Sequence, residues 1–171
     1  MSQDNGLRIY ETILHHRLVL IITSDANPWK PNIQKWLQIN RGDEVLYMVW
    51  LTLTPRHNSI LVFISDLRAL IAEASFDTSI DGDRLTPLDL EDYLIDLMND
   101  IVERQNEVVL VLEDYHHIQE PAIHAALQMM LEFTPTNFHV LITSQNRPPL
   151  ALARLHLLGQ MVELEERALN E

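Results

Sequence analysis

Two acidic side chains, Glu113 and Asp114, directly follow the apolar run VVLVL at 108–112. Such a run is typical of a strand that is buried on both faces of a parallel sheet. Because ligands of parallel α/β folds bind outside the carboxyl ends of the strands, we expect the acids at a ligand crevice. In a nucleotide hydrolase, the first acid holds Mg²⁺ through water and the second orients the attacking water. The alternative is a solvent-facing strand end or a cap of the following turn.

A phosphate-binding loop, the other half of such a site, would follow the apolar run LVLII at 18–22. The segment there is SDANPWKPN and contains no glycine, although glycines allow successive backbone N–H groups to converge on phosphates. If Lys30 is the phosphate lysine, Asn27 and Trp29 occupy the neighbouring glycine positions. Pro31 then occupies the position of the hydroxyl that ligates magnesium, and it lacks a backbone N–H donor. We therefore expect an ordinary strand-to-helix turn here.

Histidines close to the acidic pair could contribute to a metal site or to a hydrolase triad. His116, His117 and His124 with a carboxylate are residue types that bind metals, although adjacent histidines in a turn usually point in different directions. Ser144, a histidine and Asp114 would supply the members of a hydrolase triad, but no G-x-S-x-G elbow surrounds Ser144. An unrelated metal enzyme or hydrolase therefore stays open as an alternative.

The elements that must position these residues alternate between strand and helix along the chain. This alternation predicts an α/β fold of three layers, with a mostly parallel sheet of about five strands and helices on both faces. A single domain over residues 1–171 is expected, since no linker divides the pattern. Apolar periodicity predicts strands at 18–22, 45–53, 108–112, 139–143 and 161–164, and helices from Asn32, at 60–74, from Pro87 to about 105, at 122–133 and at 150–157.

Composition excludes several classes of protein. The 171 residues are 47% hydrophobic, which suffices for one well-buried core. With 12 Lys and Arg against 25 Asp and Glu, the net charge of -13 disfavours direct binding to nucleic acid and to anionic membranes. The chain has no cysteine, which excludes disulfides and thiolate metal sites. Neither a targeting segment nor an apolar run of membrane-spanning length is present, so a cytoplasmic location is expected.

A long segment resembles a known family. The sequence VLVLEDYHHIQEPAIHAALQMMLEFTPTNFHVLITSQNRPPLALARLHLLGQMVEL closely resembles the ATPase core of the maltose-regulator-like, large LuxR-type transcription factors. These belong to the STAND class of signalling NTPases. The shared theme is an apolar strand with two acids and a Tyr-His pair, then a T-S strand end, then P-P-L-x-L-A-R-L-x-x-x-G-Q-h-x-E-L. Weaker similarity upstream includes VWLTL at 49–53, which is similar to the family's V-A-W-L-S-L strand.

The resemblance implies a P-loop NTPase-like core and assigns roles to several positions. Glu113 stands where the family usually has the magnesium-binding Asp, and Asp114 is at the second acid. Gln145 replaces the arginine that follows T-S and senses phosphate, and Arg147 is a possible substitute for it. Lys30 corresponds to the phosphate-loop lysine only after a one-residue shift of the alignment, and neither register restores a glycine.

We therefore expect a degenerate NTPase-like signalling module, inactive as an ATPase, that acts through protein contacts with a partner or with itself. Relatives continue into winged-helix, helical-repeat and DNA-binding domains, and none is expected within residues 1–171. The first alternative is a switch that still binds ATP or ADP with magnesium through Lys30, Glu113 and Asp114. The second is the unrelated hydrolase or metal enzyme.

Overall fold

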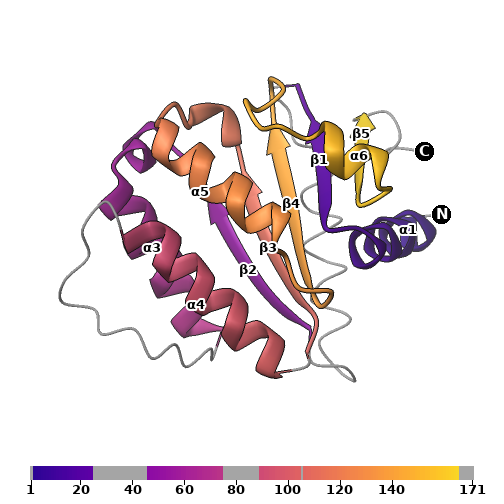
Figure 1. Ribbon diagram of the computed structural model, residues 1–171. Helices are drawn as coiled ribbons and strands as arrows, with labels where there is room; N and C mark the ends of the chain where they lie inside the picture. The colour runs from indigo at the N-terminus through magenta and orange to yellow at the C-terminus, as the bar shows by residue number, and fades with distance from the viewer. Residues whose placement is uncertain (1, 25–45, 75–88, 105, 166–171) are drawn as a thin grey trace.

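The computed structural model of the chain describes residues 2–24, 46–74, 89–104 and 106–165 (Figure 1). The predicted helix from Asn32 and the phosphate-loop segment after Ser24 lie outside these residues. In chain order the elements are α1 (Ser2–His15), β1 (Leu18–Ile22), β2 (Tyr47–Thr52), η2 (Pro55–Asn58), α3 (Ile60–Glu73), α4 (Asp89–Arg104), β3 (Val108–Glu113), η3 (Tyr115–His117), α5 (Pro121–Glu132), β4 (Phe138–Ser144), α6 (Ala153–Leu157) and β5 (Met161–Glu165).

Five strands of the described chain form one sheet in the order β2-β3-β4-β1-β5, and every neighbouring pair is parallel. All residues of the inner strands β3 and β4 are buried, which agrees with their continuous apolar sequences. The outer strands β2 and β5 alternate between buried and more exposed positions. The parallel α/β sheet predicted from the sequence is confirmed.

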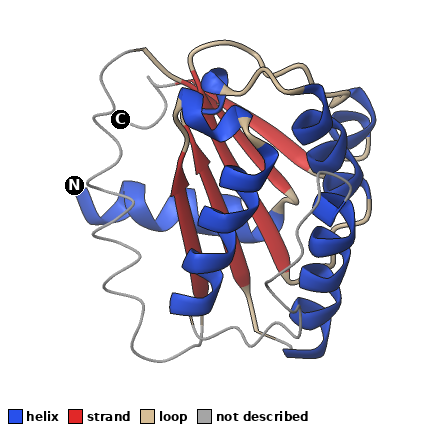
Figure 2. Cartoon of the chain, turned by 90° about the vertical axis from the view of Figure 1, so that its left-hand side faces the viewer, coloured by secondary structure: helices blue, strands red, loops and turns tan. Residues whose placement is uncertain are grey.

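Helices cover both faces of this sheet. On one face, strand residues such as Leu20 and Leu110 share a core with α3, α4 and α5. On the other face, Val19 and Val111 pack with Ile9 and Ile13 of α1. Figure 2 shows the sheet between the amino-terminal helix and the remaining helices. The three layers predicted from the alternating pattern are therefore present.

Helix α1 is not among the elements predicted from the sequence. The signal for it is weak: Ile9 and Ile13 lie one turn apart, and only they are deeply buried among the described side chains of this helix. Packing of this narrow stripe on the sheet, rather than the helix's own sequence, stabilises α1.

The helix predicted at 150–157 is shorter than expected, since α6 begins only at Ala153. The backbone of the two residues before α6 forms hydrogen bonds outside the helix. The N–H of Ala151 donates to the side-chain carbonyl of Gln128 on α5 at 2.8 Å, and the N–H of Leu152 donates to the carbonyl of Leu150 at 3.0 Å. This anchoring to α5 delays the start of the helix.

No helix within the described residues is long and apolar enough to cross a bilayer.

Candidate functional site

Because all strands run in parallel, their carboxyl ends meet at one edge of the sheet (Figure 1). Glu113 ends β3, and Ser144 ends the neighbouring β4. The backbone N–H of Thr23, just after β1, donates to the carbonyl of Ser144 at 2.9 Å. The structure thus brings the ends of β1, β3 and β4 together, which is where ligands of this architecture bind.

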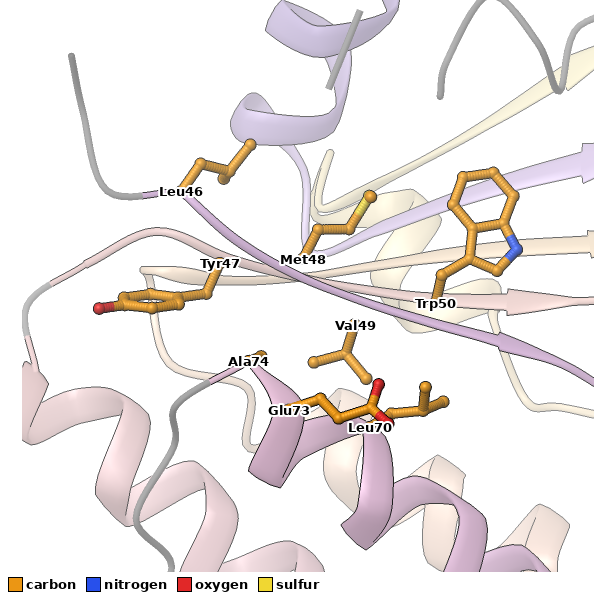
Figure 3. A pocket seen from close by; sticks show the side chains of 8 residues that line it. All are labelled: Leu46, Tyr47, Met48, Val49, Trp50, Leu70, Glu73 and Ala74. Atoms are coloured by element: carbon orange, nitrogen blue, oxygen red, sulfur yellow. The ribbon is translucent and has the colours of Figure 1, made fainter. Parts of the chain in front are cut away.

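The carboxylate of Glu113 is buried, with 1% of the residue exposed, and is held from the neighbouring strand β2. Its Oε2 atom accepts hydrogen bonds from the indole Nε1 of Trp50 and from the hydroxyl of Thr52, both at 2.8 Å. Thr52 lies directly opposite Glu113 in the strand register. Figure 3 shows Trp50 and Val49 on opposite sides of β2, with Val49 toward α3. Glu113 therefore lies on the face of the sheet that α1 covers.

This arrangement is a poor fit for a magnesium ligand. Two neutral donors occupy Oε2, and both belong to β2, the strand farthest from the loop that follows β1. A carboxylate that holds Mg²⁺ through water presents its oxygens to the hydration shell of the ion. Glu113 instead directs Oε2 to an indole and a threonine, so this oxygen already has two donors before any hydrated Mg²⁺ approaches.

Asp114 has a left-handed backbone, with φ at 60° and ψ at 45°, and is the one non-glycine residue with positive φ among the described residues. Its N–H donates to the hydroxyl of Thr143 on β4 at 3.1 Å, and its carbonyl accepts from the N–H of His117 at 3.1 Å. Asp tolerates this conformation better than most residues, yet such positions cluster at functional sites. Its carboxylate does not cap the turn, so the capping role considered from the sequence is wrong.

Gln145 lies beside the acidic pair but exposes its side chain. Its backbone N–H donates to Nδ1 of His116 at 3.3 Å, which ties the end of β4 to the turn after β3. Ser144 is buried, and its hydroxyl has no hydrogen-bond partner in the described part of the chain. The triad of Ser144, a histidine and Asp114 is therefore not assembled.

The two remaining predicted site residues, Arg147 and Lys30, are not placed beside the acidic pair by the described structure. Arg147 forms an ion pair with Glu163 of β5, so its side chain is directed along the outer strand. Lys30 lies outside the described residues.

The histidines near the acids do not converge on a metal. The rings of His116 and His117 lie 4.3 Å apart, but no group of three His, Asp or Glu side chains within the described ranges has the geometry of a metal site. Nδ1 of His124 is 2.8 Å from the hydroxyl of Tyr115. Burial raises the pKa of Tyr115 well above its usual value and lowers the pKa of His124, against an opposing effect of the Glu120 carboxylate. Both shifts favour the neutral forms of the two side chains in this hydrogen bond.

A hollow of about 480 Å³ lies along β2, with Tyr47 and Trp50 in its lining together with Glu73 at the end of α3 (Figure 3). Its lining does not include Glu113, Asp114 or Gln145. Trp50, which donates to Glu113, is the residue that connects this hollow to the acidic pair.

Trp50 and Thr52, which hold Glu113, have no role in the sequence-based site. The available signal is the alternation of residues 50 and 52 on a predicted strand, which places both on one face. Which strand lies beside β2 depends on the tertiary fold.

Comparisons with known proteins identify the fold. No family model matches the chain. Among solved structures, Cdc6p from Pyrobaculum aerophilum has a TM-score of 0.60 at 14% identity, covering 95% of this chain and 43% of that one. A chain of the Drosophila ORC bound to AT-rich DNA and Cdc6 has a TM-score of 0.59 at 10% identity, covering 96% of this chain and 53% of that one. The chain has the fold of an ATPase core. The predicted P-loop NTPase-like architecture is confirmed.

Sequence comparison relates this ATPase-core-like domain to bacterial regulators. The HTH-type transcriptional regulator MalT of Klebsiella pneumoniae is 28% identical over 159 residues, which cover 91% of this chain and 17% of the regulator. MalT of Vibrio cholerae is 25% identical over 119 residues, which cover 67% of this chain and 13% of that protein. The chain thus spans less than a fifth of the length of these curated relatives, and the resemblance stated from the sequence motifs is confirmed.

Proposed function

We propose that the chain is an NTPase-like regulatory module that acts through protein contacts and does not hydrolyse ATP. The observation that carries this proposal is the placement of Glu113. The side chain at the magnesium position of the family is buried and satisfied from β2 by Trp50 and Thr52. A buried carboxylate that already accepts two hydrogen bonds stabilises the sheet, and Oε2 can face the hydration shell of a metal ion only at the cost of those bonds.

Two sequence features support the proposal. The segment after β1 has Asn27, Trp29 and Pro31 in place of two glycines and a hydroxyl. These changes remove the conformational freedom of the glycines, one backbone N–H donor at Pro31 and the magnesium ligand of the phosphate loop. Gln145 replaces a phosphate-sensing arginine and carries no charge. Without these groups, the second acid Asp114 has no phosphate to act on.

The regulatory part of the proposal rests on similarity to MalT, which is a transcriptional regulator. The chain corresponds to 17% of that protein. We propose that it contributes to regulation through a protein partner or a second copy of itself. Direct contact with nucleic acid is not part of the proposal, because the net charge of -13 repels a phosphate backbone.

Thermal unfolding with and without nucleotide tests the proposal. A ligand at 100 times its Kd stabilises the native state by about 2.7 kcal/mol, which corresponds to a rise in Tm of about 5–11 °C for a domain of this size. We expect no change in Tm with 1 mM Mg-ATP or Mg-ADP, and no release of phosphate from ATP. EDTA-treated protein with nucleotide alone is the matched control.

A magnesium-dependent rise in Tm with either nucleotide would overturn the proposal. It would favour the nucleotide switch, and Lys30→Ala would then separate the two cases. In a genuine switch this substitution removes the rise in Tm. A rise that persists in Lys30→Ala would place the nucleotide away from the phosphate-loop lysine.

A further inference from the structure

The short helix α6 lies beside β5 at one edge of the sheet (Figure 1), and two hollows flank it. The larger hollow has a volume of about 590 Å³ and an apolar floor that includes Leu150, Leu152 and Met161. The smaller has a volume of about 210 Å³ and is polar, with Arg17 and Arg154 in its lining. Both hollows have Ala151 in their lining. We call α6 together with the two hollows the α6 surface.

Large apolar side chains of the α6 surface are exposed in the described part of the chain. Leu157 is 85% exposed and Leu158 is 57% exposed, the former being the most exposed large apolar residue of the described chain. Only Leu155 of the helix is buried. Adjacent exposed leucines beside an apolar hollow are typical of an interaction surface, because a single exposed leucine is common but a contiguous patch is not.

The charge of the α6 surface is opposite to that of the whole chain. Three arginines line its hollows against two glutamates, although acidic residues outnumber basic ones by 25 to 12 in the sequence. Glu163 pairs with Arg147, and Glu132 accepts a hydrogen bond from Gln128. Arg154 is exposed, and its side chain has no hydrogen bond or ion pair with any described residue. Its guanidinium is therefore available to a carboxylate of a partner.

The frame of the α6 surface is held in place before any partner binds. Gln128 on α5 accepts from the N–H of Ala151 at 2.8 Å, and its Nε2 is 3.3 Å from the carbonyl of the same residue. The guanidinium of Arg17 donates to the carbonyl of Glu132 at 3.2 Å, at the end of α5. Such preorganisation lowers the entropic cost of binding.

We propose that the α6 surface docks an acidic amphipathic segment of a partner protein. An apolar side chain of the segment enters the hollow beside Leu157 and Met161, and a carboxylate on the same face binds Arg154. Charge complementarity selects an acidic partner, and the exposed leucines select an amphipathic one. This inference rests on the proposed function, action through protein contacts, and names the partner's chemistry and the surface that receives it.

Fluorescence anisotropy with a labelled peptide tests the inference on the full chain. The probe is a synthetic peptide of sequence DLEDYLIDLMNDIVER, which is acidic and amphipathic and corresponds to α4 of this chain. The control peptide has Asn or Gln at every acidic position. We expect the acidic peptide to bind about tenfold more tightly than the neutral one, with affinity that falls as salt rises.

Variants of the protein locate the contact. Arg154→Glu and Leu157→Ser are expected to weaken binding about tenfold each, since both side chains are exposed and their loss leaves the fold intact. Arg104→Glu makes the same change of charge on α4, away from the α6 surface, and is expected to leave the affinity unchanged. Far-UV circular dichroism checks that each variant is folded.

Equal binding of the acidic and neutral peptides, or equal effects of Arg154→Glu and Arg104→Glu, would overturn the inference. A dimer in sedimentation equilibrium that Arg154→Glu dissociates would also overturn it, because the occupant would then be a second copy of the chain. These outcomes differ from failure of the proposed function, which appears as stabilisation by Mg-nucleotide in the unmodified protein.

Discussion

The hydrogen bond from Thr52 to Glu113 gives a sharp test of how the acidic pair is held. Thr52→Val removes the hydroxyl while keeping the size and the β-branch of the side chain. A hydrogen bond to a charged acceptor contributes about 1.5–3 kcal/mol. Thr52 is exposed, so water replaces its hydroxyl in part, and we expect a loss near the lower limit, about 1.5 kcal/mol. For a domain of this size the corresponding fall in Tm is about 3–6 °C.

Urea denaturation followed by circular dichroism measures this loss, with Thr136→Val as the matched control. Thr136 is exposed and forms no side-chain hydrogen bond with the described residues, so its substitution is expected to change the free energy of unfolding by less than about 0.5 kcal/mol. A double-mutant cycle with Glu113→Gln isolates the pair, because the hydroxyl then donates to a neutral oxygen and its contribution falls. An effect of Thr52→Val no larger than that of Thr136→Val would refute the assignment of Glu113 as a carboxylate held by β2.

Three further predictions concern local contacts. The pKa of His124 is lowered in the folded state, so its contribution to stability is present above the unfolded value of about 6.5 and is lost as pH falls. His124→Asn should therefore reduce the change of the urea midpoint between pH 7 and pH 5. The same pH dependence in both proteins would show that His124 does not cause it. Tyr93→Phe removes a buried hydroxyl that has no hydrogen-bond partner among the described residues and should raise the free energy of unfolding by about 1 kcal/mol, whereas a loss would show that the hydroxyl is paired. Gly159→Ala should cost about 1–2 kcal/mol because φ is +64° there, although nothing lies within 4 Å of the added Cβ; an unchanged urea midpoint would mean that the backbone relaxes.

The strands at the centre of the sheet could be predicted closely from the sequence. The runs at 18–22 and 108–112 coincide with β1 and with all but the last residue of β3. Continuous apolar runs have one favourable environment in a chain of this size, a sheet covered on both faces, so their position depends little on other segments. The helices α3 and α5 could also be predicted from the sequence, because their apolar residues recur at a regular helical spacing.

Two elements could not be predicted because their stability comes from other parts of the chain. Helix α1 depends on the sheet face against which Ile9 and Ile13 pack. The start of α6 depends on Gln128, which lies 23 residues before Ala151 in sequence and binds its backbone. No local pattern encodes either contact.

For the candidate site, too, some features follow from the sequence and others only from the tertiary structure. The sequence by itself determined that two acids end a buried strand, that the loop after β1 has no glycine, and that the uncharged Gln145 follows the Thr-Ser pair at the end of another buried strand. Tertiary structure alone decided that Glu113 accepts hydrogen bonds from Trp50 and Thr52, residues 63 and 61 positions away. The physical reason is that residue types and local periodicity fix which side chains end each strand, whereas the partners of a buried carboxylate depend on strand order and register, which are set by packing of the whole sheet.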